Sequence, residues 1–319
     1  MYTSPVSIII PNYNGEHILG RSMMDVIAAV DAYPQACEII VVDDASRDNS
    51  CRLLAEKFPQ IRVIRHQVNR GFAEAVHSGV KSSTYPILIF LNTDVFPDRD
   101  FMAPLIRWFE RQDTFAVSPL ILNPDGNPIR VSWNLSTLVR GEIRQTNWDL
   151  SDALDRARKN QPLKSLFASG GSVAIRKEMF QELGGFLPIY KPFYYEDRDL
   201  CTRAWQRGWK TYFEPQSKVI HDHQSTISRF FAAHQIRVIK RRNRLFYLWL
   251  HLSRRKLLLS HIPWILCRLL LRLLRLDMVY ARALLHAVFF WGRILQQRAA
   301  MHQWRLRRPL EDVIREIWL

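Results

Sequence analysis

Four short clusters of polar side chains each follow directly after a run of apolar residues in the first third of the chain. The clusters are Asn12-Tyr13-Asn14, Asp43-Asp44, Asn69-Arg70-Gly71 and Asn92-Thr93-Asp94. A crevice that gathered aromatic, carboxylate, amide and glycine groups would suit a nucleotide. The alternative is that turn residues must follow strands in any case, and for one cluster alone this explanation is equally good.

The apolar runs before these clusters have the pattern of buried parallel strands. They are Val6–Ile10, Glu38–Val42, Ile61–Ile64 and Ile87–Leu91. Amphipathic stretches between them, such as Ile18–Val30 and Asn49–Phe58, predict helices. Strands that alternate with helices indicate an α/β fold with a parallel, doubly wound sheet. Ligands in such sheets bind outside the carboxyl ends of the strands, where all four clusters would meet.

The remaining chain predicts one further half of this domain and a helical tail. Residues 122–165 have several proline and glycine breakers and are interpreted as an inserted loop. We then expect a strand at Ser169–Ile175, a helix at Glu196–Arg207, and short strands near Thr211–Phe213 and Lys218–Ile220. From Thr226 the pattern is helical, with interruptions at Pro263 and Pro309. The predicted division is residues 1–228 and residues 229–319.

Charge is distributed very unevenly along the 319 residues. Residues 1–228 have no net charge, whereas residues 229–319 hold 19 basic and 4 acidic side chains, a net charge of +15. Such a basic segment is typical of proteins that bind a polyanion, either anionic lipid or nucleic acid. The four cysteines are too scattered for a disulfide framework or a zinc site. The N-terminus has no pattern of an export signal, so we expect a reducing, cytoplasmic location.

The clusters, with two later motifs, resemble those of the family 2 glycosyltransferases, which have the GT-A fold, and among them bacterial enzymes of the rhamnosyltransferase type. The resemblance covers roughly residues 5–250. The segments that carry it are Val6–Asn14, Ile40–Asp48, Asn69–Phe72, Asn92–Asp94, Ser169–Ser172 and Glu196–Leu200. It implies a Rossmann-like, mostly parallel sheet flanked by helices. No GxGxxG motif follows the first strand, which argues against a dinucleotide dehydrogenase.

The resemblance implies a nucleotide site at the strand ends. Pro11 and Tyr13 would present backbone and ring to the base, and Asp43 or Asp44 would accept the imide N–H of a pyrimidine. The alternative for the two aspartates is a turn that caps the next helix. The remaining residues assigned to the nucleotide are Asn14, Asn69, Gly71, Asn92 and Thr93.

A divalent metal site is implied by Asn92-x-Asp94, which stands where the family has Asp-x-Asp. A diphosphate leaving group needs a cation to absorb its developing charge, and Mg²⁺ or Mn²⁺ prefers oxygen ligands. Asn92 removes one negative charge, so the donor diphosphate would supply much of the site. His221 matches a position that provides a further ligand in several relatives. A structural or solvent-facing histidine is the alternative.

The general base implied by the resemblance is Asp197, in Glu196-Asp197 at a helix N-terminus. It would deprotonate the acceptor hydroxyl in a single inverting displacement. Ordinary helix capping is the alternative reading of these acidic residues and is our interpretation of Asp199. Ser169, Gly170, Gly171 and Glu196 are assigned to donor or acceptor contacts; a bulged strand is the alternative for the glycines.

The basic tail has the pattern of amphipathic helices. Within Lys256–Leu276, Arg268, Arg272 and Arg275 share one helical face. Charges of this kind cost about 2.5–3.5 kcal/mol each in a spanning helix, so a position in the membrane interface is easier. The alternative is that the apolar faces pack on each other or on a partner subunit. Tryptophans at 249, 264, 291 and 304 favour a headgroup belt.

These features predict an inverting, metal-dependent glycosyltransferase at the inner face of a membrane. Its donor would be a nucleotide-diphosphate sugar, for which rhamnose is consistent with the resemblance. Its acceptor would be a hydroxyl of a lipid-linked or cell-surface glycan. Transfer to polyprenyl phosphate is a close alternative. A nucleic-acid-binding protein is a different alternative, which leaves the carboxylates unexplained, so no nucleic-acid partner is predicted; a homo-oligomer is left open.

Overall fold

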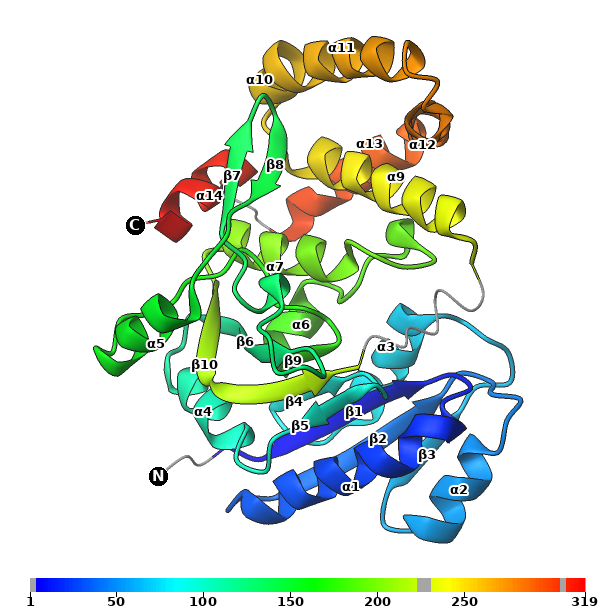
Figure 1. Ribbon diagram of the computed structural model, residues 1–319, viewed down its shortest axis with the longest axis vertical. Helices are drawn as coiled ribbons and strands as arrows, with labels where there is room; N and C mark the ends of the chain where they lie inside the picture. Colours follow the sequence, from blue (N-terminus) through cyan, green and yellow to red (C-terminus); the bar gives the residue numbers. More distant parts are fainter. Residues whose placement is uncertain (1–3, 223–230, 305–307, 319) are drawn as a thin grey trace.

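The computed structural model describes residues 4–222, 231–304 and 308–318. Its lower part in Figure 1 is an α/β layer built on one large sheet, and its upper part is a layer of helices from the C-terminal third of the chain. The expected α/β architecture with a C-terminal helical region is confirmed.

The central sheet is mixed but mostly parallel. Its order is β3-β2-β1-β4-β9-β6-β10-β5. Only β9 and β5 run against their neighbours. The strand bounds are β1 Val6–Asn12, β2 Cys37–Asp43, β3 Arg62–Arg65, β4 Ile87–Leu91, β5 Val95–Pro97, β6 Thr114–Leu122, β9 Ser172–Arg176 and β10 Lys210–His221.

Helices cover both faces of this sheet, which explains the continuous apolar runs in β1 and β4. Ile8 shares one core with α1 (Glu16–Ala32), α2 (Ser50–Lys57) and α4 (Met102–Ile106). Ile9 faces the other core, which includes α3 (Phe72–Ser82), α6 (Lys177–Glu182) and α7 (Glu196–Arg207). At Gly79 of α3 a Cβ would lie 2.4 Å from Cγ2 of Ile9, so only glycine lets α3 approach β1 this closely.

Two of the expected local structures need correction. The segments expected as short strands near Thr211–Phe213 and Lys218–Ile220 are strand residues, but they belong to one strand, β10. An irregularity between Glu214 and Lys218 lies between them, and the residue pattern does not distinguish it from a loop. The segment expected as an inserted loop contains a hairpin of β7 (Ser136–Val139) and β8 (Glu142–Gln145), followed by α5 (Leu150–Arg158).

The C-terminal helices extend the second core. α9 (Ala233–His251) and α14 (Leu310–Trp318) bury apolar side chains in the same cluster as α7. Trp318 Nε1 donates to the Ser136 carbonyl at 2.8 Å. Residues 223–230 lie outside the described part of the chain, so Thr226 as the start of the helical pattern, and the predicted division at 228, stay predictions.

Between α9 and α14 the chain forms a helical arch at the top of Figure 1. It consists of α10 (Arg254–Lys256), the π-helical η4 (Leu257–His261), α11 (Ile262–Leu273), α12 (Met278–Phe289) and α13 (Trp291–Ala300). The expected interruption at Pro263 is wrong, because the π-helical turn lets the helix continue through a residue without an N–H. Trp249, expected at a headgroup belt, is instead buried against Trp291.

No single helix in residues 4–222, 231–304 or 308–318 has both the length and the apolar character needed to cross a membrane. The pair α12 and α13, bent by 57°, satisfies both criteria only when taken together.

Candidate active site

The carboxyl ends of four strands bring the predicted residues to one edge of the sheet. Asn12 ends β1, Asp43 ends β2, Asn92 follows β4 and His221 ends β10. Because β9 runs antiparallel to β4, it starts at this edge, directly after Ser169-Gly170-Gly171. The fold therefore brings the motif Ser169-Gly170-Gly171 to the same edge as the early clusters, although it follows them by more than 70 residues in the sequence.

An open cleft of about 640 Å³ lies beside the ends of β1, β2 and β3. The predicted residues Tyr13 and Asn69 line it, which places an aromatic ring and an amide at its wall. Pro11 instead lies within β1, opposite Val42. The other lining residues were not predicted from the sequence. They follow β2, or they end or follow β3: Ala45, Ser46, Arg47, Arg65, His66, Gln67 and Val68. The position of β3 beside β2 in the sheet could have identified them, because it puts the carboxyl ends of both strands at the cleft.

Asp43 stabilises the turn that forms one wall of the cleft. It accepts hydrogen bonds from Asn12 Nδ2 and from the backbone N–H of Ser46, each at 3.0 Å. The Ser46 hydroxyl in turn accepts the N–H of Asn14 at 2.9 Å, while the Asn14 side chain accepts the N–H of Arg47 at 2.8 Å. The side chains of Asn14 and Asp43 thus stabilise this turn by hydrogen bonds. A direct contact of Asp43 with a base stays a prediction.

Asp44 has a similar supporting role on the opposite wall. Its carboxylate accepts the N–H groups of Arg70 and Gly71 at 2.8 and 2.7 Å, and it contacts His66 Nδ1 at 2.7 Å. Gly71 has a φ of +88°, so this approach to the carboxylate requires glycine. Asp44 is buried and organises the Asn69–Gly71 loop before α3.

Asp94 and His221 meet at the same edge of the sheet, where β4 and β10 end. Their Oδ1 and Nε2 atoms are 3.2 Å apart. The cause is the antiparallel pairing of β5 with β10, which sets His221 opposite Val95. The N–H of Asp222 also donates to the Asp94 carbonyl at 3.0 Å.

This pair has the donor chemistry of a partial divalent-cation site. It offers one carboxylate oxygen and one imidazole nitrogen, both partly exposed. Within residues 4–222, 231–304 and 308–318, no three His, Cys, Asp or Glu side chains form a complete cluster. The residues therefore fit a cation whose other ligands come from a bound phosphate group and water, as the replacement of the first family aspartate by Asn92 predicts.

Backbone hydrogen bonds of the motif Ser169-Gly170-Gly171 connect Asn92 to Asp197. Asn92 donates its N–H to the Gly171 carbonyl at 2.9 Å, and the N–H of Gly170 donates to Asp197 Oδ2 at 3.1 Å. A Cβ at Gly171 would lie 2.7 Å from Asn92 Nδ2. A Cβ at Gly170 would lie 3.3 Å from the Cβ of Asp197, so a side chain at either glycine would crowd its neighbour. Ser169 holds the same turn by accepting the N–H of Ser172, and Thr93 lies between Asn92 and Asp94, half-buried.

The two acidic residues at the start of α7 have different surroundings. Burial raises the pKa of Asp197, although the N–H groups of Gly170 and Arg198 and the Arg198 guanidinium oppose this rise. Burial and the neighbouring Asp197 raise the pKa of Glu196 to about 8. Among the described residues, Glu196 Oε2 has no hydrogen-bond partner. We therefore assign the negative charge of the pair to Asp197, because only its carboxylate accepts two backbone hydrogen bonds.

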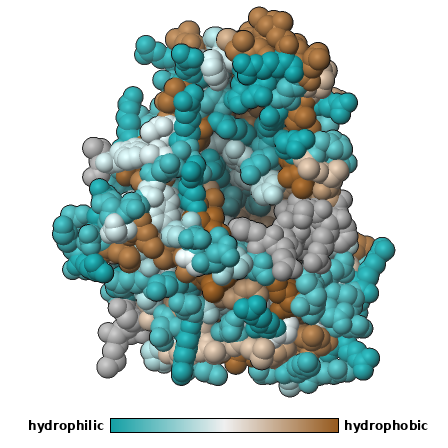
Figure 2. All heavy atoms as spheres, in the orientation of Figure 1, coloured by the Kyte–Doolittle hydropathy of each residue, from teal (hydrophilic) through white to brown (hydrophobic). Residues whose placement is uncertain are grey.

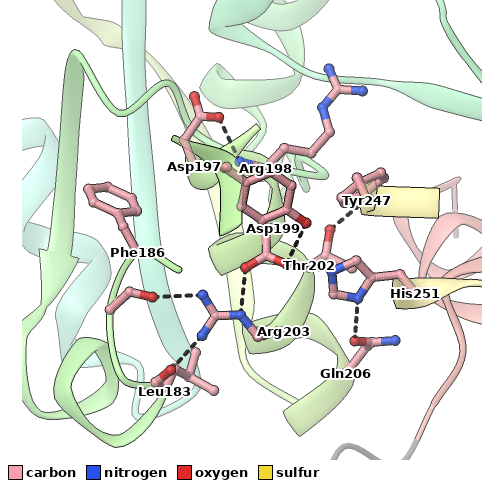
Figure 3. A network of polar contacts seen from close by, with 12 residues as sticks. Leu183, Phe186, Asp197, Arg198, Asp199, Thr202, Arg203, Gln206, Tyr247 and His251 are labelled. Carbon is pink, nitrogen blue, oxygen red and sulfur yellow. Dashed lines mark hydrogen bonds and ion pairs between the residues drawn. The ribbon is translucent and has the colours of Figure 1, made fainter. Parts of the chain in front are cut away.

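Asp199 belongs to a buried network beneath the site, and its assignment as a helix cap is wrong (Figure 3). It accepts Arg203 Nε at 2.7 Å, the Tyr190 hydroxyl at 3.0 Å and His251 Nε2 at 2.8 Å. Burial alone would raise the pKa of Asp199, but Arg203 and His251 outweigh it and lower that pKa. Arg203 also donates to the carbonyls of Leu183 and Gly185.

Asn243 of α9 holds the loop that precedes Asp197. Its buried Nδ2 donates to the carbonyls of Tyr190, Phe193 and Tyr194 at 2.7–2.9 Å. Tyr194 and Tyr195 have φ values of +72° and +80°, each costing about 1–3 kcal/mol in a residue with a side chain. The sequence analysis missed this residue. The spacing of Asn243, Tyr247 and His251 at every fourth position, which puts three polar side chains on one face of a helix, was the available signal.

A family model described as glycosyl transferase family 2 matches residues 7–184. The chain belongs to this family. The family part of the resemblance is confirmed, and its rhamnosyltransferase part stays a prediction. The roles assigned to the site residues also stay predictions, and Asp197 and His221 lie beyond the matched residues.

Curated relatives are distant and longer. Pre-mycofactocin glycosyltransferase of Mycobacterium tuberculosis is 25% identical over 236 residues, 71% of this chain and 44% of that protein. Polypeptide N-acetylgalactosaminyltransferase 10 of Homo sapiens is 25% identical over 232 residues, 67% of this chain and 37% of that protein. The chain thus spans less than half the length of these relatives.

Solved structures confirm the GT-A-like fold of this family 2 chain. GalNAc-T7 with UDP, GalNAc and Mn²⁺ superposes with a TM-score of 0.61 and 20% identity, over 79% of this chain and 49% of that one. The mannosyltransferase PcManGT from Pyrobaculum calidifontis, in complex with GDP-Man and Mn²⁺, has a TM-score of 0.56 and 18% identity, over 100% of this chain and 86% of that one.

We expect Arg203→Met to lower the free energy of unfolding by about 3–5 kcal/mol, because it leaves Asp199 buried without its cation. Arg207→Met is the matched control: it removes an arginine one turn later on α7, whose partner Glu182 is partly exposed, and should cost below about 1 kcal/mol. Urea denaturation at neutral pH measures both. Equal effects of the two substitutions would contradict the role given to the buried pair.

Proposed function

We propose that the chain is an inverting, metal-dependent glycosyltransferase that moves a sugar from a nucleotide-diphosphate donor to a hydroxyl group. The observation that carries the proposal is that two hydrogen bonds link Asp197 to the strand ends. The N–H of Gly170 donates to Asp197, and the N–H of Asn92 donates to the carbonyl of the adjacent Gly171. In this proposal, Asp197 is the base, Asp94 and His221 are part of a cation site, and the open cleft receives the nucleotide. A displacement reaction between two bound substrates needs these three components together.

In the proposed reaction, Asp197 takes the proton of the acceptor hydroxyl as that oxygen bonds to the anomeric carbon. The bond from this carbon to the diphosphate oxygen breaks at the same time, and the configuration inverts. The N–H of Gly170 orients the Asp197 carboxylate. Asp94 and His221 would hold Mg²⁺ or Mn²⁺, which supplies positive charge at the leaving diphosphate.

The donor is proposed to bind with its nucleoside in the 640 Å³ cleft. Tyr13 offers a ring beside the base, and Arg47 and Arg65 place positive charge in the same cleft for phosphate groups. The UDP and GDP-Man of the solved relatives support a nucleotide diphosphate without selecting the base. A deoxyhexose donor such as rhamnose rests on the motif resemblance alone.

The acceptor is proposed to be a hydroxyl of a lipid-linked or cell-surface glycan at the inner face of the cell membrane, with polyprenyl phosphate as the alternative. A nucleic-acid partner is less well supported, because two tail arginines face inward: Arg272 is 2.8 Å from Asp277, and Arg268 is 3.6 Å from Glu142. These guanidinium groups are already paired within the protein.

Nucleotide binding is testable by thermal shift. We expect one of UDP, GDP and dTDP to raise the melting temperature in the presence of Mn²⁺, because a ligand of the native state adds about 2.7 kcal/mol at 100 times its Kd. Asp94→Asn should remove the Mn²⁺-dependent part of the shift. Asp98→Asn, an exposed carboxylate four residues later, is the control and should retain it. No shift with any nucleotide would sink the proposal.

Asp197→Asn should lower kcat for transfer by about 10²–10⁴-fold while the nucleotide-dependent thermal shift persists, since the amide cannot accept the proton. The active form is the carboxylate, so wild-type kcat should rise with pH through a pKa above the ordinary value of 3.8. Glu196→Gln distinguishes the two neighbouring acids. Glu196, with a pKa of about 8, is mostly neutral at pH 7, so this substitution should lower kcat less than Asp197→Asn. If Glu196→Gln were as inactive as Asp197→Asn, the base would be misassigned.

Asn243→Ala should lower kcat by about 10–100-fold with little change in KM for the donor, because the loop before Asp197 loses its three hydrogen bonds and the base moves. Tyr247→Phe is the matched control. It removes one buried hydrogen bond, to Thr202, from the same helix and should leave kcat and its pH profile unchanged. A wild-type kcat and pH profile in Asn243→Ala would show that Asn243 supports folding only.

A further inference from the structure

Helix α11 is oriented with its charged side toward the protein and its apolar side toward solvent. Arg272 Nη1 lies 2.8 Å from Oδ2 of Asp277, and Arg268 Nη1 lies 3.6 Å from Oε2 of Glu142, whose side chain is buried. The Arg268 guanidinium also stacks over the Tyr280 ring at 5.3 Å. Two of the three arginines that share one face, Arg268 and Arg272, thus form ion pairs within the protein.

The opposite side of α11 exposes a row of leucines. Leu266, Leu270 and Leu274 recur at every fourth position and are 60%, 61% and 74% exposed. A surface helix normally buries such a stripe. Here only Ile265 of α11 is buried, so the stripe has no covering element among the described residues.

The neighbouring segments continue the same surface. Leu259 of η4 is 72% exposed, and Leu285 and Phe289 of α12 are 69% and 84% exposed. We call Leu259, Leu266, Leu270, Leu274, Leu285 and Phe289 the apolar ridge. Figure 2 shows hydrophobic residues gathered at the top of the molecule, where α11 lies in Figure 1. Contiguous exposed apolar surface of this kind marks an interaction site.

Exposed cations flank the ridge. Arg255 precedes it, Arg275 lies between α11 and α12, and Arg282 lies on α12. The sequence from 254 to 300 contains one acidic residue, Asp277, and its carboxylate already contacts Arg241 and Arg272. The surroundings of the ridge are therefore strongly basic. A second copy of the chain would bring the same cations together across a symmetric interface, which opposes self-association.

We propose that the apolar ridge docks on an anionic lipid bilayer, with α11 lying in the plane of the surface. The leucines enter the boundary between headgroups and acyl chains, and Arg255, Arg275 and Arg282 contact lipid phosphates. The ion pairs of Arg268 and Arg272 keep these two cations on the protein side of the helix. This docking does not depend on the proposed transfer reaction and is measured without it.

Vesicle co-sedimentation of the full chain tests the proposal. We expect wild-type protein to bind vesicles of equal parts phosphatidylglycerol and phosphatidylcholine more strongly than phosphatidylcholine alone. The triple variant Leu266→Gln, Leu270→Gln, Leu274→Gln should lose at least about tenfold in partition coefficient. Arg275→Glu with Arg282→Glu should weaken binding to the anionic vesicles, most strongly at low salt.

The control variant is Met24→Gln with Val63→Gln, which removes exposed apolar side chains from the α/β layer and should bind vesicles as the wild type does. All variants alter exposed residues, and an unchanged melting temperature verifies their folding. Undiminished vesicle binding by the leucine variant would overturn the proposal. A second result would also overturn the proposal: the wild-type protein does not bind vesicles and forms an oligomer, and the leucine substitutions dissociate this oligomer.

Discussion

The buried carboxylate of Asp199 joins the proposed catalytic edge of the molecule to its C-terminal helices, because it contacts both Arg203 on its own helix α7 and His251 on α9. The side chains of Asp199 and Arg203 have no exposed surface, so each depends on the other and on the hydrogen bonds from Tyr190 and His251. His251 belongs to α9, while Asp199 is two residues after Asp197 on α7. The position of the proposed base is therefore set by helices that the family model does not reach.

The aspartates at this edge of the sheet divide, by their hydrogen bonds, into two that support loops and two that are proposed to take part in the reaction. Asp43 and Asp44 accept N–H groups from loops that form the walls of the cleft. Asp94 faces His221 across the β5–β10 pairing, and Asp197 receives the N–H of Gly170. Burial raises the pKa of Asp197, which brings a carboxylate closer to the strength that a general base needs near neutral pH. One sheet edge thus accommodates several aspartates with separate tasks.

Much of the α/β layer was predictable because its signals are local. Continuous apolar runs and the turn residues behind them identified β1 to β4 and the crevice at their ends. The helix over Glu196–Arg207 was predicted with the observed bounds. The hairpin β7–β8 was not, because its strands are four residues each and pair mainly with one another. The cleft residues after β3, such as His66, became visible only when the strand order was known.

The sequence by itself determined which residue types follow each strand and that α11 has a charged and an apolar side. Helical periodicity separates two faces, but it does not state which face the protein covers. Only the tertiary structure decided this, because Glu142 and Asp277 offer Arg268 and Arg272 internal partners and leave the leucines in solvent. Asp199 and Asn243 also acquired their roles in this way, since ion pairs and hydrogen bonds between distant segments exist only after the chain has folded.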